Sequence, residues 1–199
     1  MIAKLAEKTA LFFAKKNIYE YNKIDIYKYG FELLISTIIN SFCIFLISIL
    51  LGIVFEALLF VVAFIPLRLS AGGYHAKHHW SCILSMSITF FIFAIILKHM
   101  NSNFVLLYSI STVFVSSLLI WVFSPVEAVN KPLKDKQREK QRNQSIFLVS
   151  MNMVAAIISY LFPFVPKIMI AFYVSGMLAA SLLLVVAIAT NKTKSSPAQ

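Results

Sequence analysis

Six apolar stretches, separated by short polar connectors, account for most of the 199 residues and limit what the chain can fold into. A helix needs about 20 predominantly apolar residues to cross a bilayer. Hydrophobic residues make up 60% of the chain and charged residues only 13%, whereas a soluble domain has about 25% charged residues. The sequence therefore predicts an all-α polytopic membrane protein with six transmembrane helices, over residues 31–51, 53–69, 81–97, 104–123, 145–162 and 168–190.

The distribution of Lys and Arg predicts how these helices are oriented. Cytoplasmic loops of membrane proteins carry an excess of basic residues. With six crossings, sixteen of the eighteen basic residues fall on the side of the two termini, and only Lys98 and Lys167 fall on the other side. We therefore expect both termini in the cytoplasm. The same distribution accounts for the net charge of +10 without a nucleic-acid partner.

Residues 1–30 precede the first apolar stretch and have a different pattern. Over residues 1–17, the apolar residues would share one side of a helix and the lysines the other. The apolar side would comprise Ile2, Leu5, Thr9, Phe12 and Phe13. This pattern predicts an amphipathic helix in the membrane interface, with a simple positively charged leader as the alternative. We expect residues 31–190 to form the membrane domain and residues 191–199 to form a disordered tail.

One polar segment, residues 68–82, interrupts the apolar sequence between the second and third stretches. It holds three of the four histidines, one of the two cysteines and two of the five glycines. Polar groups between membrane spans are costly to keep, so they mark a functional site by default. Cys82 stands at the expected start of a helix with basic residues nearby, and both features lower the pKa of a thiol. Its thiolate could attack a peptide carbonyl once a histidine has accepted the proton.

The spacing of the histidines leaves several interpretations of this segment open. In a continuous helix His78 would lie one turn before Cys82, whereas His75 would lie about 10 Å away, so spacing favours His78 as the base. His75, His78, His79 and Cys82 also follow the i, i+3, i+4, i+7 pattern of one helical face, which suits Zn²⁺. A polar cluster without chemistry is the third interpretation.

These interpretations correspond to different classes of function. A thiol site indicates a membrane cysteine peptidase, and a metal site indicates a zinc-dependent membrane peptidase or a small transporter gated by histidine or metal. A transporter usually places ionisable groups within its spans, whereas Glu32, Glu56 and Lys98 fall at the ends of theirs. A membrane anchor or assembly protein is the class without chemistry. The second cysteine, Cys43, lies mid-span among apolar residues and is expected to pack there.

A second polar segment, residues 125–143, separates the fourth and fifth apolar stretches and is expected to be a basic cytoplasmic loop. Its basic residues are Lys131, Lys134, Lys136, Arg138, Lys140 and Arg142. Such a segment can anchor the protein on anionic lipid or dock an acidic peptide, and the two roles are compatible.

The first polar segment contains a pattern of residues that can be compared with known families. It reads Arg68-x-x-x-Gly72-Gly73-x-His75-Ala76-Lys77, with Cys82 at the head of the following span. The pattern resembles that of the accessory gene regulator protein B family, bacterial membrane cysteine endopeptidases that process quorum-sensing peptide precursors. The resemblance extends to chain length, to six spans and to the segment Pro125-Val126 … Lys131-Pro132.

The resemblance implies roles for individual residues. Cys82 would be the nucleophile and His75 the general base and acid, with Arg68, Gly72 and Gly73 supporting the site. His78 and His79 are not part of the family pattern, which argues against His78 as the base and against a zinc site. No metal and no other cofactor is therefore expected.

The resemblance also implies a substrate and a reaction. The substrate would be a short precursor with an amphipathic N-terminal helix, a central Cys or Ser, and an acidic C-terminal tail that binds the basic segment. Cleavage before the tail would leave the precursor as a thioester on Cys82, from which a thiolactone or lactone ring closes. The expected location is the bacterial cytoplasmic membrane, with residues 68–82 facing the cytoplasm. A second copy of the chain, in a homodimer, is a further candidate partner.

Overall fold

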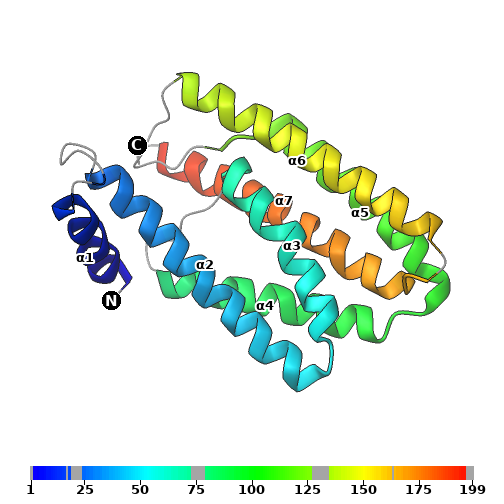
Figure 1. Cartoon of the computed structure of the whole chain (residues 1–199). Coiled ribbons are helices and arrows are strands. Elements are labelled where there is room, and N and C mark those ends of the chain that lie inside the picture. Colours follow the sequence, from blue (N-terminus) through cyan, green and yellow to red (C-terminus); the bar gives the residue numbers. More distant parts are fainter. Residues whose placement is uncertain are drawn as a thin grey trace.

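The computed structural model describes residues 2–16, 18, 24–72, 79–126, 135–162 and 164–195. These residues form helices, turns and a single isolated bridge, and no strand is present among them. The seven helices are α1 (Ile2–Lys15), α2 (Ile24–Leu51), α3 (Val54–Ala71), α4 (His79–Lys98), α5 (Ser102–Phe123), α6 (Asp135–Leu161) and α7 (Lys167–Ser195) (Figure 1). The all-α fold predicted from the sequence is confirmed.

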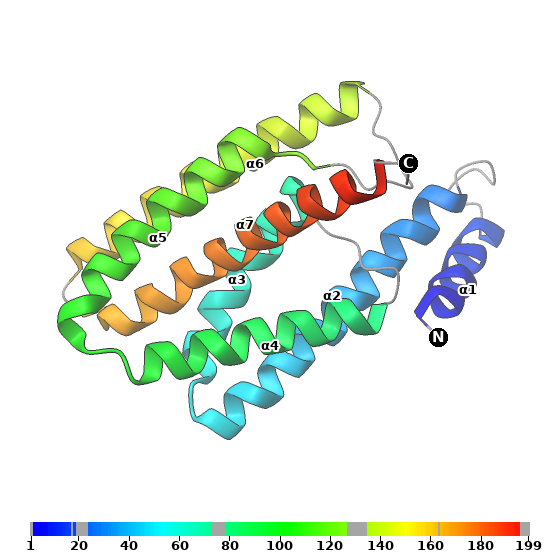
Figure 2. The same ribbon diagram turned by 180° about the vertical axis from the view of Figure 1, so that it is seen from behind.

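Five of these helices are long and apolar enough to cross a membrane, namely α2, α3, α5, α6 and α7. The described apolar part of α4, Ile83–Lys98, is shorter. Each of the six apolar stretches coincides with one helix, and successive helices run in opposite directions (Figures 1 and 2). The sixth crossing, the cytoplasmic side and the interfacial position of α1 stay predictions.

Three helix ends differ from the predicted stretches. Helix α2 begins at Ile24 rather than at residue 31, and α6 begins at Asp135 rather than at residue 145. Helix α7 continues through Ser195, so residues 191–195, expected in the disordered tail, are helical. Hydropathy marks only the part of a helix that lies in lipid. At the start of α6 the added residues are mostly Lys, Arg, Gln and Glu, which are good helix formers and extend the helix into water.

Helix α7 lies at the centre of the bundle, between α3 and α5 (Figures 1 and 2). Of its most apolar 18-residue window, 61% is buried inside the protein. Gly176 of α7 faces α3 so closely that a Cβ atom at this position would collide with the carbonyl oxygen of Phe60. Small residues allow membrane helices to approach in this way, so Gly176 sets the α3–α7 distance.

Two hydrogen bonds between side chains join α7 to its other neighbours. The hydroxyl groups of Tyr108 on α5 and Ser175 on α7 lie 2.6 Å apart. The hydroxyl of Tyr173 on α7 donates to Oδ1 of Asn152 on α6 at 2.5 Å. Such bonds stabilise helix association where no water is available as an alternative partner.

Helix α2 lies at the outside of the bundle and is far less buried than α7, with 17% of its most apolar window buried. It carries α1, which packs through Ala6, Ala10 and Ala14. Nζ of Lys28 on α2 lies 3.0 Å from Oε2 of Glu7 on α1. The alanines form a third side of α1, while Leu5 and Phe12 of its expected apolar side are exposed. Helix α1 therefore keeps an apolar side free for the predicted contact with lipid.

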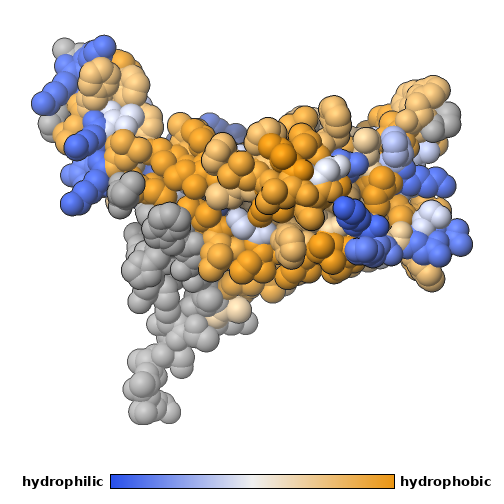
Figure 3. Space-filling model, turned by 90° about the horizontal axis from the view of Figure 1, so that it is seen from below, coloured by the Kyte–Doolittle hydropathy of each residue, from blue (hydrophilic) through white to orange (hydrophobic). Residues whose placement is uncertain are grey.

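The surface agrees with a membrane protein. Hydrophobic residues cover most of the middle of the face drawn in Figure 3, and hydrophilic residues gather toward its two ends. Many of the largest side chains on the outer helices are exposed, including Phe55, Phe114 and Trp121. A surface of this kind is stable in lipid and unstable in water.

Candidate active site

The site predicted from the sequence begins at the C-terminal end of α3. Helix α3 ends at Ala71, and Gly72 follows it with φ +76°, a conformation that glycine adopts without strain. Nη1 of Arg68, in the last turn of α3, donates to the carbonyl oxygen of Gly72 at 3.2 Å. Two of the predicted supporting residues are thus in direct contact, and the guanidinium fixes the backbone at the point where the polar segment leaves the helix.

Gly72 also forms an isolated parallel bridge with Val126, the residue that follows Pro125 after the end of α5. The backbone N–H of Val126 donates to the carbonyl oxygen of Ala71 at 3.0 Å. A Cβ atom at position 72 would collide with the carbonyl oxygen of Val126, so only glycine fits this contact. The beginnings of the two polar segments are therefore joined, through Gly72 and Val126. We call this contact the Gly72–Val126 bridge.

Cys82 lies in the first turn of α4, which begins at His79. The expected position of this cysteine at a helix start is confirmed for the backbone. The first four N–H groups of an α-helix have no partner within the helix and give this end a partial positive charge, which favours a thiolate over a thiol. Gly73, His75 and His78 lie outside the described residues, as do the side-chain surroundings of His79 and Cys82.

The choice between His75 and His78 as the base therefore stays a prediction, and so does the rejection of a zinc site. Among the residues whose side chains are described, no group of three or more His, Cys, Asp or Glu side chains could hold a metal ion. The four residues of the zinc interpretation are not among them.

The basic segment is helical from Asp135 onward. Residues Lys136, Arg138, Lys140 and Arg142 belong to the first turns of α6 and are exposed, whereas Lys131 and Lys134 lie outside the described residues. The expectation of a loop across residues 125–143 is therefore wrong from Asp135 onward. A helix presents these side chains on defined faces, which a loop would not.

The described parts of the site lie at one end of the bundle. The end of α3, the start of α4, the end of α5 and the start of α6 are at the same end in both ribbon views, together with the last turn of α7 (Figures 1 and 2). The Gly72–Val126 bridge is the part of this arrangement that sequence reasoning missed. Its signals were Gly72 after an apolar helix and Pro125 after another, which mark chain turns but not their contact.

Comparison with known proteins identifies the family. The sequence matches the family model of Accessory gene regulator B over residues 6–197. The chain belongs to this family. It is 27% identical to an AgrB-like protein of Clostridium perfringens over 147 residues, which are 71% of this chain and 69% of the relative.

Other relatives give the same assignment. Protein FsrB of Enterococcus faecalis is 26% identical over 124 residues, covering 62% of this chain and 51% of the relative. An AgrB-like protein of Clostridium acetobutylicum is 26% identical over 159 residues, covering 79% of this chain and 75% of the relative. No solved structure matches the chain.

The resemblance inferred from the polar segment is thus confirmed. Membership of the AgrB family associates the chain with processing of the autoinducer peptide in quorum sensing. Together with the apolar helices, it makes the chain a multi-pass membrane protein that acts on a peptide precursor.

Proposed function

We propose that this AgrB-family protein is a membrane cysteine endopeptidase that removes the acidic C-terminal tail of a short autoinducer precursor through a thioester on Cys82. The observation that carries the proposal is the position of Cys82 in the first turn of α4, at the same end of the bundle as the Gly72–Val126 bridge. Family membership supports a peptide substrate, and the helix start supports a thiolate.

The proposed reaction has two acyl transfers. His75 takes the proton from Sγ of Cys82, and the thiolate attacks the carbonyl carbon of the bond before the tail. The C–N bond breaks, the proton passes from His75 to the leaving amine, and the precursor stays bound as a thioester. A thiol or hydroxyl of the precursor then attacks the thioester carbonyl, loses its proton to the base, and releases Cys82 as the ring closes. The precursor reaches the site from the cytoplasmic face of the membrane. Exclusion of water from the site favours ring closure over hydrolysis of the thioester.

The basic residues would hold the acidic tail. Opposite charges across an interface orient a partner and speed its association. Four basic side chains project from the first turns of α6, at the end of the bundle where Cys82 lies. Lys131 and Lys134 would add to the same positive region from the adjoining chain.

The buried polar groups of the described residues argue against a transporter. They belong to serine, threonine and asparagine, such as Ser116, Asn152 and Ser175, and none of those described is ionisable. A proton or ion pathway through the spans would normally require ionisable groups there.

The decisive experiment is to trap the thioester. The protein and precursor are co-expressed, and mass spectrometry is used to detect a hydroxylamine-sensitive adduct on Cys82 that lacks the tail of the precursor. Cys82→Ala should abolish both adduct and cleavage, while the matched Cys43→Ala variant should retain both, because Cys43 lies within α2. Cleavage by Cys82→Ala at the rate of the unmodified protein would overturn the proposal.

A second pair of variants identifies the base. His75→Ala is expected to prevent adduct formation, and His78→Ala is expected to leave it intact. The opposite result would show that the helical spacing, not the family pattern, gives the correct base. Loss in both, with bound zinc in the unmodified protein, would favour a metal site instead.

A further inference from the structure

The four described basic residues of α6 fall on two different faces of the helix. The buried face of α6 comprises Ser145, Val149, Asn152 and Ala156, which follow helical spacing. Arg138 and Arg142 precede Ser145 by seven and three residues, so they continue this inward face toward the end of the bundle. The two lysines do not follow this spacing.

Lys136 and Lys140 are four residues apart and share the outward face with Phe147, which follows Lys140 by seven residues. The two described arginines and the two described lysines of α6 therefore lie on opposite faces of the helix.

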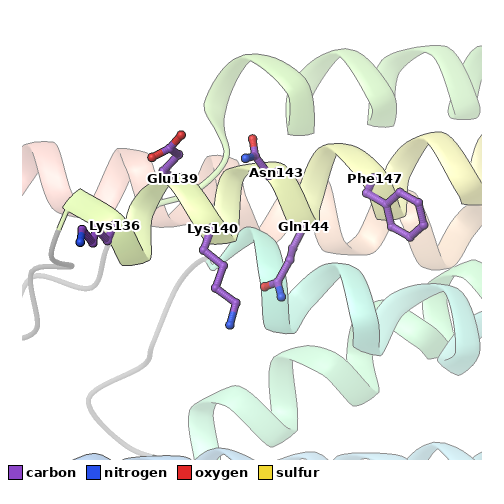
Figure 4. Close-up of a pocket in the computed structure, with 6 residues that line it drawn as sticks. All are labelled: Lys136, Glu139, Lys140, Asn143, Gln144 and Phe147. Carbon is purple, nitrogen blue, oxygen red and sulfur yellow. The ribbon is translucent and has the colours of Figure 1, made fainter.

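The outward face carries a shallow surface hollow that is widely open to its surroundings, and all of its described lining residues belong to α6. Its volume is ≈ 720 Å³, and its described lining residues are Lys136, Glu139, Lys140, Asn143, Gln144 and Phe147 (Figure 4). Lys140 and Gln144 project to one side of α6, while Glu139 and Asn143 project to the other (Figure 4). The carboxylate of Glu139 therefore points away from the side of α6 that presents the ammonium group of Lys140 and the amide group of Gln144. That side suits a small anionic group with several oxygen acceptors.

The lower part of this hollow, from Gln144 to Lys140, lies at the depth of the headgroup layer of a membrane. The apolar part of α6 starts near Ser145, and Lys140 and Lys136 precede it by about 8 and 14 Å along the helix axis. Headgroups occupy about 5–8 Å on each side of the hydrocarbon core, so Lys140 lies at the outer edge of this layer and Lys136 lies one turn above it. Phe147 lies two residues inside this boundary, and 66% of its surface is exposed. An aromatic ring below a lysine pair would contact the upper part of an acyl chain.

We propose that Lys136, Lys140, Gln144 and Phe147 form a binding site for one anionic phospholipid, with its phosphate at the lysines and its upper chain against the phenyl ring. This assignment narrows the docking of the acidic tail proposed above, because Arg138 and Arg142 on the inward face would contact the tail and Lys136 and Lys140 would not. The lipid site does not depend on the peptidase activity, because it uses only the outward face of α6. An acidic peptide as the occupant of this face is the other outcome of the test.

The test compares two double variants with the same change of charge. Full-length protein in detergent is titrated with phosphatidylglycerol, and with phosphatidylcholine of the same acyl chains as a reference, and bound lipid is counted by native mass spectrometry. Lys136→Gln/Lys140→Gln should weaken phosphatidylglycerol binding roughly 10- to 30-fold, since each lysine in contact with the headgroup would contribute about a three- to fivefold share of the affinity. Arg138→Gln/Arg142→Gln should change it less than about threefold.

Further variants separate a site from general attraction. Lys136→Arg/Lys140→Arg should restore most of the binding, because the charge is retained. Phe147→Ala should weaken binding of phosphatidylglycerol more than binding of a soluble headgroup phosphate. Equal losses in the lysine and arginine variants, or no loss in either, would overturn the site. The lipid site would also be overturned if Lys136→Gln/Lys140→Gln lost binding of an acidic peptide but kept binding of phosphatidylglycerol.

All of these variants can be made in a Cys82→Ala background. Lipid binding can therefore succeed or fail without reference to the thioester. Failure of the lipid site would leave the proposed peptidase untouched, and absence of cleavage in the unmodified protein would leave the lipid measurement valid.

Discussion

Helices α7 and α2 are both long and apolar, yet they are held in the protein by different means. Helix α7 is surrounded by α3, α5 and α6, approaches α3 at a glycine, and exchanges side-chain hydrogen bonds with two neighbours. Helix α2 packs against α3 and α4 with little burial and carries α1 on its outer side. In lipid, apolar surface alone does not drive helices together. Hydropathy thus predicts that both helices enter the membrane, whereas the small and polar residues indicate which of the two is central.

The candidate site lies between these two regions. Two of its described contacts, Arg68 with Gly72 and Gly72 with Val126, belong to α3 and to the chain after α5, both next to α7. Cys82 belongs to α4, which packs against α2 and meets α3 where the rings of Phe90 and Phe60 are 5.2 Å apart. The nucleophile is therefore placed by α4, and its supporting residues by the central helices.

The largest effect on stability is expected at Gly176. Gly176→Ala places a Cβ atom against the carbonyl oxygen of Phe60, so α3 and α7 must move apart, at a cost of about 1–3 kcal/mol. Thermal unfolding in detergent, followed by circular dichroism, measures this cost. Gly30→Ala is the control, because nothing lies within 4 Å of a Cβ there, and alanine should be neutral or slightly stabilising. Similar losses of stability in Gly176→Ala and Gly30→Ala would contradict the conclusion that α7 is packed more tightly than α2.

The next effect concerns activity and compares two glycines with positive φ. Gly72→Ala must displace Val126, whereas Gly52→Ala, at φ +70°, meets nothing within 4 Å. Both variants carry a backbone cost, and that of Gly72→Ala is the larger because φ +76° with ψ −149° is a conformation that essentially only glycine adopts. The difference between the two variants therefore measures the total cost of disturbing the chain at the Gly72–Val126 bridge. We expect Gly72→Ala to process the precursor roughly 10- to 100-fold more slowly than Gly52→Ala. Equal rates would show that the bridge does not position the site.

A smaller effect is expected from the bond between α7 and α6. Tyr173→Phe leaves Oδ1 of Asn152 without its donor and should reduce the free energy of unfolding by about 0.6–1.7 kcal/mol. Thr37→Val on α2 is the control, since its hydroxyl donates to the carbonyl oxygen of Leu33 in the same helix. Unfolding of the two variants under the same detergent conditions gives the comparison. An equal or larger loss in Thr37→Val would contradict it.

The smallest effect is expected at the contact between α1 and α2. Glu7→Gln removes the 3.0 Å ion pair with Lys28, but both side chains are accessible to solvent, where such pairs contribute little. We expect no measurable change in the unfolding temperature at physiological salt. A clear loss that disappears at high salt would show that α1 is held more tightly than its burial suggests.

The sequence predicted the positions of the helices well because the apolar stretches are long and separated by clear breaks. Helix α2 ends at Leu51, directly before Gly52, as predicted. Helix α5 begins at Ser102 and ends at Phe123, within two residues of its predicted ends. The polar beginning of α6 was missed, since Asp135 to Gln144 carry no hydropathy signal although they form a good helix. Helix propensity, applied to the charged segment, could have indicated it.

The candidate site was predictable only in part. The residues of the polar segment and the position of Cys82 at a helix start follow from local pattern, which one sequence contains. The Gly72–Val126 bridge joins residues far apart in the chain, and no local pattern specifies such a contact. The two faces of the basic helix needed the helix boundary before they could be distinguished.

The Gly72–Val126 bridge has a consequence for how this family can vary in length. The bridge fixes one point in each of the two polar segments. For the contact to form, the number of residues must stay constant from Arg68 to Gly72 and from Ser124 to Val126. Insertions and deletions among relatives should therefore fall after Gly72 or after Val126 and not before them. Length differences between relatives would then lie in the residues that follow Gly72 and Val126, and the number of residues that leads from α3 and from α5 to the bridge would stay the same.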